Sequence, residues 1–143
     1  RNLAEMFGIK VPIIAVVIGE GGSGGALGIG VADSILMLEN SVYSVISPEG
    51  CATILFNDAK KAPDAARSLK IDSISLKNFG IIDGIIKEPL GGAHKDLKQA
   101  SINLKTAVLK EFKKIDKFEI ENLLEKRYNK YRKIGEFFEK FIN

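Results

Sequence analysis

Apolar residues follow two different patterns along the chain. Up to about residue 92, short continuous apolar runs alternate with glycine-rich or polar turns, as is typical of strands buried on both faces of a parallel sheet. Beyond that point, apolar residues recur every three or four positions, which indicates amphipathic helices. Thirteen of the fourteen glycines lie at or before Gly92, so glycine use changes at the same place. We therefore expect one α/β domain, with a core over residues 1–96 and a helical extension over residues 97–143.

The same pattern predicts the individual elements. Predicted strands cover residues 11–18, 34–38, 42–46 and 81–86. One predicted helix ends near Gly8, another begins at Ala26, and others cover residues 48–56, 62–69, 76–79 and 97–115. A last apolar stripe has either the chain's own core or another subunit as its partner surface, and it consists of Leu123, Leu124, Tyr128, Tyr131, Ile134, Phe138 and Phe141.

A glycine-rich loop follows the first predicted strand. Seven of the twelve residues from Gly19 to Gly30 are glycine. Glycine lets backbone N–H groups approach a ligand closely, and a helix that begins after such a loop adds unpaired N–H donors and the positive end of its dipole. The loop therefore predicts a site for an anion, which is a phosphate, a nucleotide or a reaction intermediate.

Two familiar motifs also match this loop. Gly19-x-Gly21-x-x-Gly24, with Glu39 twenty positions after Gly19, matches the dinucleotide fingerprint of an oxidoreductase. The segment after the loop is short for a crossover helix, however, and glycines interrupt it. Gly21-x-Ser23-x-Gly25 matches a nucleophile elbow, for which His94 is the only histidine that can act as base. We expect Ser23 to be a small loop residue instead.

Composition excludes several protein classes. The 143 residues are 45% hydrophobic and carry a net charge of +3, which is ordinary for a globular protein. We expect neither a secretion signal nor a membrane span, because the longest apolar run is far below about 20 residues. Residues 97–143 hold twelve basic and seven acidic side chains, yet such mixed helices are usually solvated, and nucleic acid is not the expected partner. The single cysteine, Cys51, excludes an internal disulfide and a cysteine-type zinc site.

Three strings of residues resemble one known family. VVIGEGGSGGALGIGVAD at residues 16–33, YSVISPEGCATILF at 43–56 and KEPLGGAH at 87–94 resemble the α subunit of acetyl-CoA carboxylase carboxyltransferase, in that family's order and spacing. Lys126-Arg127-Tyr128 resembles the family's closing segment, so the resemblance covers nearly the whole chain. Members are about twice as long, and we expect this chain to be a C-terminal part.

The resemblance implies a fold and a reaction. The implied fold is crotonase-like, of the ClpP/crotonase superhelix of ββα units. The implied reaction moves a carboxyl group from carboxybiotin to acetyl-CoA and gives malonyl-CoA, the first committed step of fatty acid biosynthesis. It would need backbone N–H donors that stabilise developing negative charge, and no side-chain nucleophile or general base, so neither Glu20 nor Glu49 is expected to act as one.

Family resemblance also assigns roles to individual residues. Gly24 and Gly25 are expected to form the oxyanion hole on the biotin side. The residues expected to shape the loop or line the biotin channel are Gly21, Gly22, Ser47, Pro48, Glu49 and Gly50. On the basis of their charge alone, Lys60, Lys61 and Arg67 are candidates for contacts with the phosphates of CoA. Cys51 is expected to be a small buried helix residue and His94 to make a loop hydrogen bond, with no metal site in this chain.

Partners and compartment follow from the resemblance in the same way. The chain is expected to act with a β subunit, in an assembly of two α and two β subunits, and β is expected to carry the zinc. Biotin would arrive on the biotin carboxyl carrier protein after ATP-dependent loading by biotin carboxylase, and no cofactor is expected to be covalently bound here. The expected compartment is the bacterial cytoplasm, with the plastid stroma as alternative. Alternative functions are a NAD-binding fragment of an oxidoreductase and a non-catalytic assembly fragment.

Overall fold

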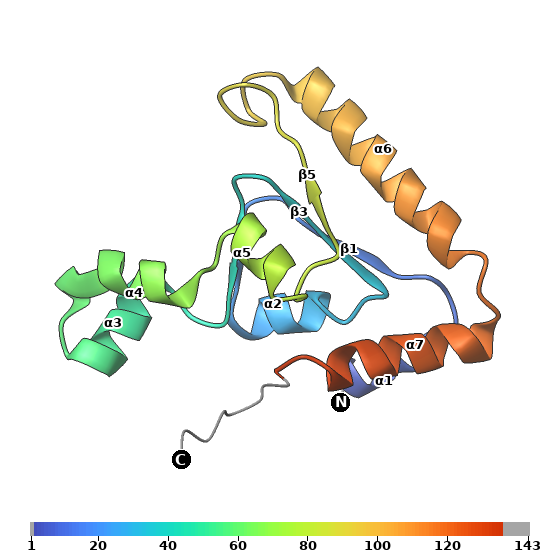
Figure 1. The fold of residues 1–143 in the computed structure, drawn as a ribbon, viewed down its shortest axis with the longest axis horizontal. Coiled ribbons are helices and arrows are strands. Elements are labelled where there is room, and N and C mark those ends of the chain that lie inside the picture. The colour runs from blue at the N-terminus through green and yellow to red at the C-terminus, as the bar shows by residue number, and fades with distance from the viewer. Residues whose placement is uncertain (1, 136–143) are drawn as a thin grey trace, which may run out of the picture.

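A three-stranded parallel sheet lies at the centre of the molecule. The computed structural model describes residues 2–135. The sheet has the order β1 (Ile14–Val17), β3 (Ser34–Leu38), β5 (Gly84–Ile86), and a two-stranded parallel ribbon joins β2 (Glu20–Gly22) to β4 (Val42–Ser44). Helices lie in the connections between successive strands of the three-stranded sheet, as is usual for parallel strands (Figure 1). The predicted α/β class with a parallel sheet is confirmed.

Residues 2–135 also contain seven α-helices and one short 3₁₀ turn. They are α1 (Asn2–Phe7), α2 (Ser23–Ile29), α3 (Pro48–Phe56), the 3₁₀ turn Ala59–Lys61, α4 (Ala62–Leu69), α5 (Ser73–Asn78), α6 (Leu97–Ile115) and α7 (Ile120–Arg132). Helices α3 and α4 pack on each other and form an arm that projects from the sheet, whereas α6 crosses beside the sheet and α7 lies along α1 (Figure 1). None of the helices within residues 2–135 is both long and apolar enough to cross a membrane.

The two faces of β3 enter two separate apolar clusters. Ile35 and Met37 face one side, where they pack with buried residues of β1 and with Leu76 of α5. Leu36 and Leu38 face the other side and pack with Ile86, and the inner face of α6 covers them. Every residue of β3 is buried, so this strand is covered on both faces, as its continuous apolar run predicted.

The last helix is anchored on the core through a few inward residues. Leu123 is buried, and Arg127 of the same helix is 1% exposed. Tyr128, in contrast, is 57% exposed, so the predicted apolar stripe is only partly covered by this chain. Phe138 and Phe141 lie outside the described residues. The division at residue 96 stays a prediction.

Several element boundaries differ from those predicted. Strand β1 is limited to Ile14–Val17, because the flanking Val11 and Ile18 point into solvent at the edge of the sheet. Strand β4 ends at Ser44, whose hydroxyl donates to the carbonyl of Ile46 and closes a turn. Strand β5 begins only at Gly84, since the amides of residues 81 and 82 return to the carbonyl of Leu76.

Two further elements were predicted wrongly. Helix α5 covers Ser73–Asn78 instead of 76–79, because the carboxylate of Asp72 accepts the amide of Ser75 and caps the helix earlier. Helix α2 begins at Ser23 instead of Ala26. Strand β2 was not predicted, since its sequence Glu20-Gly21-Gly22 has low strand propensity.

Candidate functional site

Two helices begin at the same end of the β2–β4 ribbon. Gly22 of β2 pairs with Ser44 of β4, and the strands run parallel. Helix α2 follows β2 directly, and α3 begins four residues after β4. The carboxyl ends of adjacent parallel strands share an edge, which is where α/β proteins bind ligands. The ribbon therefore places the glycine-rich segment and the Ser47–Gly50 segment on one side of the molecule.

Gly24 and Gly25 lie in the first turn of α2. This differs from the predicted loop, which placed both glycines before the helix. Gly22 is the N-cap and has no side chain that can accept a hydrogen bond, so no side-chain cap is present. The first N–H groups of a helix have no partner within it. The amides of Gly24 and Gly25 are therefore donors at the positive end of the helix dipole.

The glycines of this segment fall into two groups. A Cβ at Gly21 would lie 2.8 Å from Cδ2 of Tyr43, and a Cβ at Gly30 would collide with the hydroxyl of the same tyrosine. Packing therefore requires glycine at these two positions. Around Gly24 and Gly25, by contrast, an added Cβ would meet no atom within 4 Å, and neither has a left-handed backbone. Nothing in the described chain requires glycine there.

A cavity of about 260 Å³ lies directly beside this segment. Its wall is mainly apolar and joins the carboxyl end of β1 to α2 and β4, and it includes Val17, Gly21, Ala26, Gly30, Ile35 and Tyr43. Burial raises the pKa of Tyr43, so this phenol stays protonated at neutral pH. The cavity thus offers an apolar surface with the hydroxyl of Tyr43 beside the middle of α2.

The Ser47–Gly50 segment forms the start of α3. The hydroxyl of Ser47 accepts the amide of Gly50 at 3.1 Å, with Pro48 in the first turn, as predicted. Glu49 is exposed in the same turn. A Cβ at Gly50 would lie 3.0 Å from Cγ1 of Ile46, so local packing explains that glycine. Cys51 is buried beside Ala52 and Ala65, which confirms its prediction as a small buried helix residue.

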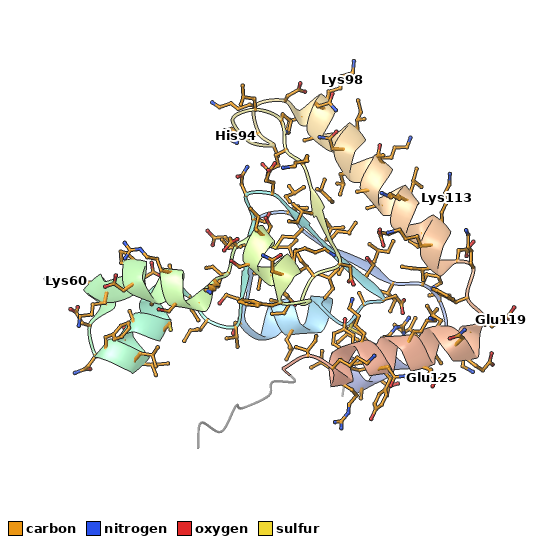
Figure 2. All side chains as sticks on the ribbon, in the orientation of Figure 1. Lys60, His94, Lys98, Lys113, Glu119 and Glu125 are labelled. Atoms are coloured by element: carbon orange, nitrogen blue, oxygen red, sulfur yellow. The ribbon has the colours of Figure 1, made fainter. Side chains whose placement is uncertain are left out.

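The three candidate CoA contacts lie on the projecting arm. Figure 2 shows Lys60 near the outer end of the arm. Lys61 lies over the ring of Phe56, with Nζ 5.4 Å from its centre, and Arg67 forms an exposed ion pair of 2.7 Å with Asp64. The structure thus groups these cations on one arm, apart from α2 (Figure 1).

His94 lies elsewhere, in the loop between β5 and α6. Figure 2 shows it on the far side of the sheet from α2, so the motif at Ser23 that matches a nucleophile elbow has no histidine beside it. Glu39, the acidic residue of the dinucleotide motif, accepts Lys87 at 2.6 Å. The segment around His94 lines a second, open cavity of about 560 Å³ with Glu39 and Glu88. Within residues 2–135 no three His, Cys, Asp or Glu side chains gather as metal ligands.

Two tyrosines that hold α2 were missed as site residues by the sequence reasoning. The hydroxyl of Tyr43 donates to the carbonyl of Ala26 at 3.0 Å. The hydroxyl of Tyr131 accepts the amide of Ala32 at 2.7 Å, and its single O–H hydrogen has the carbonyls of Gly30 and Ala32 within hydrogen-bonding reach. A tyrosine in an otherwise apolar stripe was the available signal, because a buried phenol needs a hydrogen-bond partner.

Comparisons with known proteins agree on one family. The sequence matches the profile described as acetyl co-enzyme A carboxylase carboxyltransferase-like over residues 1–135. It is 58% identical over 137 residues to the acetyl-coenzyme A carboxylase carboxyl transferase subunit alpha of Fusobacterium nucleatum, covering 96% of this chain and 44% of that relative. The same subunit of Bacillus cytotoxicus is 57% identical over 136 residues, covering 95% of this chain and 42% of the relative. The chain thus spans less than half the length of these relatives.

The fold is also similar to that of a solved structure. That structure is the Pseudomonas malonate decarboxylase hetero-tetramer in complex with coenzyme A, with a TM-score of 0.59 at 15% identity. The match covers 91% of this chain and 51% of that one. At such low identity the likeness concerns the fold alone, and it confirms the predicted crotonase-like architecture.

Proposed function

The chain belongs to the acetyl co-enzyme A carboxylase carboxyltransferase-like family, and we propose that it forms part of the α subunit that carries out carboxyl transfer to acetyl-CoA. The reaction gives malonyl-CoA, which supplies fatty acid biosynthesis. The chain spans 44% of its Fusobacterium relative, so the activity of the whole subunit is part of this proposal.

The observation that carries this proposal is the open first turn of α2. Carboxybiotin supplies the carboxyl group when it is bound, and its ureido oxygen takes up negative charge as that group departs. The amides of Gly24 and Gly25 would donate to this oxygen. They fit the task, because the N-cap offers them no side-chain acceptor and no atom of residues 2–135 fills the space where a Cβ would stand. Preorganised donors of this kind are each worth about 10²–10³ in rate.

The remaining candidate residues have supporting roles in this proposal. Ser47, Pro48 and Glu49 form the start of α3 beside the same ribbon edge and line the biotin channel. Gly21 and Gly22 set the path of the chain into α2, and Gly50 lets α3 begin close to Ile46. Each acts through position or packing instead of proton transfer.

Partners and CoA contacts complete the proposal. A β subunit would supply the acyl-CoA side and its own zinc, in an assembly of two α and two β subunits. Biotin carboxylase and the biotin carboxyl carrier protein would deliver the carboxyl group, in the bacterial cytoplasm. Lys60 and Lys61 are the stronger candidates for the CoA phosphates, because Arg67 is paired with Asp64.

The test is malonyl-CoA formation by the complete α subunit, assembled with β and supplied with acetyl-CoA and the carboxylated carrier. Gly24→Val and Gly25→Val place a branched side chain where the oxygen would approach, and we expect each to lower kcat by about 10²–10³. Gly8→Val is the matched control, since Gly8 is also exposed, has no left-handed backbone and has only one atom near an added Cβ, at 3.6 Å.

Two results would count against the proposal. An unchanged rate in Gly24→Val and Gly25→Val removes the oxyanion assignment. An assembly that binds β but forms no malonyl-CoA, with every glycine intact, supports the non-catalytic alternative instead. Lys60→Ala with Lys61→Ala tests the CoA contact separately, through a raised KM for acetyl-CoA at unchanged kcat.

A further inference from the structure

Tyr43 contacts the glycine-rich segment at three places. Its ring lies against Gly21, which pairs with it across the β2–β4 ribbon. Its hydroxyl donates to the carbonyl of Ala26 at 3.0 Å, in the middle of α2. The same hydroxyl occupies the space that a side chain at Gly30 would need. One side chain therefore spans the segment from the strand before α2 to the residue after it.

We propose that Tyr43 is a positioning residue, which fixes where the first turn of α2 points and thereby aligns the amides of Gly24 and Gly25 with the reacting oxygen. The inference rests on the proposed function, because it assigns Tyr43 a role through those amides. Donors that stabilise a transition state must be held within about 0.5 Å of the productive position by their supporting residues. Tyr43 is the side chain that contacts α2 from β4.

The short length of α2 makes this support necessary. The helix has seven residues, of which two are the glycines in its first turn and a third is Gly28. Each glycine inside a helix costs about 1 kcal/mol relative to alanine. Helices shorter than about 12 residues are marginal without tertiary contacts. The hydrogen bond from Tyr43 to Ala26 therefore stabilises a helix that is short and has a low intrinsic helix propensity.

Substitution of Tyr43 by phenylalanine separates positioning from packing. Tyr43→Phe keeps the ring against Gly21 and removes only the hydroxyl. The carbonyl of Ala26 retains the amide of Gly30 at 2.8 Å, so no buried carbonyl loses its last partner and the fold survives. We expect kcat for malonyl-CoA formation to fall about three- to tenfold, in line with one hydrogen bond. KM for acetyl-CoA stays within about twofold, because the hydroxyl of Tyr43 contacts α2 and not the candidate CoA contacts Lys60 and Lys61.

The matched control is Tyr128→Phe, the same change at a tyrosine of α7 that is 57% exposed. Both variants are measured in the complete α subunit assembled with β. Amide hydrogen exchange at Gly30, whose N–H donates to the same carbonyl of Ala26, gives a readout besides activity, and it is expected to accelerate in Tyr43→Phe but not in Tyr128→Phe.

A double variant decides whether Tyr43 acts through the amides. In the Gly24→Val background we expect Tyr43→Phe to have little further effect on kcat, because residues that act as a unit are not additive. An equal loss in both backgrounds overturns the inference, and so does a Tyr43→Phe rate equal to that of Tyr128→Phe. Both results leave the proposed function intact if Gly24→Val is itself slow. A Gly24→Val enzyme at full rate overturns the oxyanion assignment and this inference together.

Discussion

The guanidinium of Arg127 and the carboxylate of Asp33 form a buried bidentate ion pair. Nε lies 2.9 Å from Oδ1 and Nη2 lies 2.8 Å from Oδ2, and the two side chains are 0% and 6% exposed. The remaining guanidinium donors reach backbone carbonyls that include Phe7, Ile9 and Val11. Arg127 therefore ties α7 both to the segment after α1 and to the start of β3.

Breaking this ion pair is expected to destabilise the fold. Arg127→Met leaves Asp33 buried without its cation, and removal of one partner of a buried pair costs about 3–5 kcal/mol. Lysine cannot form a bidentate contact with a carboxylate, so Arg127→Lys is expected to be more stable than Arg127→Met but less stable than the wild type. The measurement is the urea dependence of unfolding of the complete subunit, with Arg132→Met on the exposed side of α7 as control. A loss below about 0.5 kcal/mol would contradict a supporting role for the pair.

The strands and helices of the core were largely predictable because their apolar periods were clear. Residues 34–38, 48–56, 62–69 and 97–115 were predicted with the boundaries that the structure has. Their patterns depend on local spacing and on caps such as Ser47, which a single sequence displays directly.

The contacts that organise the site could not be predicted in the same way. Asp33 and Arg127 are separated by 94 positions, and Ala32 and Tyr131 by 99. No local pattern encodes such pairs, because tertiary packing alone brings them together. The start of α2 was also missed, since a helix with two glycines in its first turn contradicts helix propensity. The resemblance named Gly24 and Gly25, but only the structure distinguishes them from Gly21 and Gly30.

The two groups of glycines predict opposite effects of alanine on stability. Gly21→Ala places Cβ 2.8 Å from the ring of Tyr43, and overpacking of this kind costs about 1–3 kcal/mol. Gly24→Ala meets open space and improves helix propensity by about 1 kcal/mol, so the subunit is expected to be as stable as the wild type or more so. Thermal or urea unfolding of the two variants checks both signs.

A double-mutant cycle locates the cause of the Gly21 effect. In a Tyr43→Leu background the clash is relieved, and the cost of Gly21→Ala is expected to shrink. An equal cost in both backgrounds would show that another neighbour, such as Val17, whose Cγ1 lies 3.2 Å from an added Cβ, requires glycine at this position.

Glu88 is expected to make one loop sensitive to acid. Its carboxylate accepts the amides of Asn40 and Ala93, both at 2.8 Å. Burial raises the pKa of Glu88, but these hydrogen bonds outweigh it and hold the pKa below the ordinary value of 4.5. A lowered pKa means that the contribution to stability is present above about pH 4.5 and is lost as the pH falls through the lower, folded value.

The expected outcome for Glu88→Gln follows from its single acceptor oxygen, which can serve only one of the two amides. Hydrogen exchange at Asn40 or Ala93 should then be faster at neutral pH, and the acid-induced step should disappear. Glu121→Gln, at an exposed position in the first turn of α7, serves as control. An acid step that persists in Glu88→Gln would assign it to another carboxylate, such as Glu39, whose bond from Lys87 also lowers its pKa.

The buried phenol of Tyr131 is expected to make the protein lose stability at high pH. Burial raises the pKa of this phenol to about 12, because the ionised form would lose its water in the site. The neutral hydroxyl is also the partner of the amide of Ala32, a residue that is 0% exposed. A raised pKa means that the stabilisation is complete below the ordinary value of 10 and is lost as the pH rises towards 12. The wild-type subunit should therefore lose stability between these values.

Tyr131→Phe tests this directly. It leaves the buried amide of Ala32 without its phenol partner, which costs about 1–3 kcal/mol at neutral pH. Above pH 10, however, its stability should fall less steeply than that of the wild type, so the two curves converge. Tyr128→Phe should follow the wild type throughout. Urea unfolding at pH 7, 10 and 11 measures the free energy of unfolding of each variant. If this free energy falls equally with pH in Tyr131→Phe and in the wild type, ionisation of Tyr131 is not the cause of the loss.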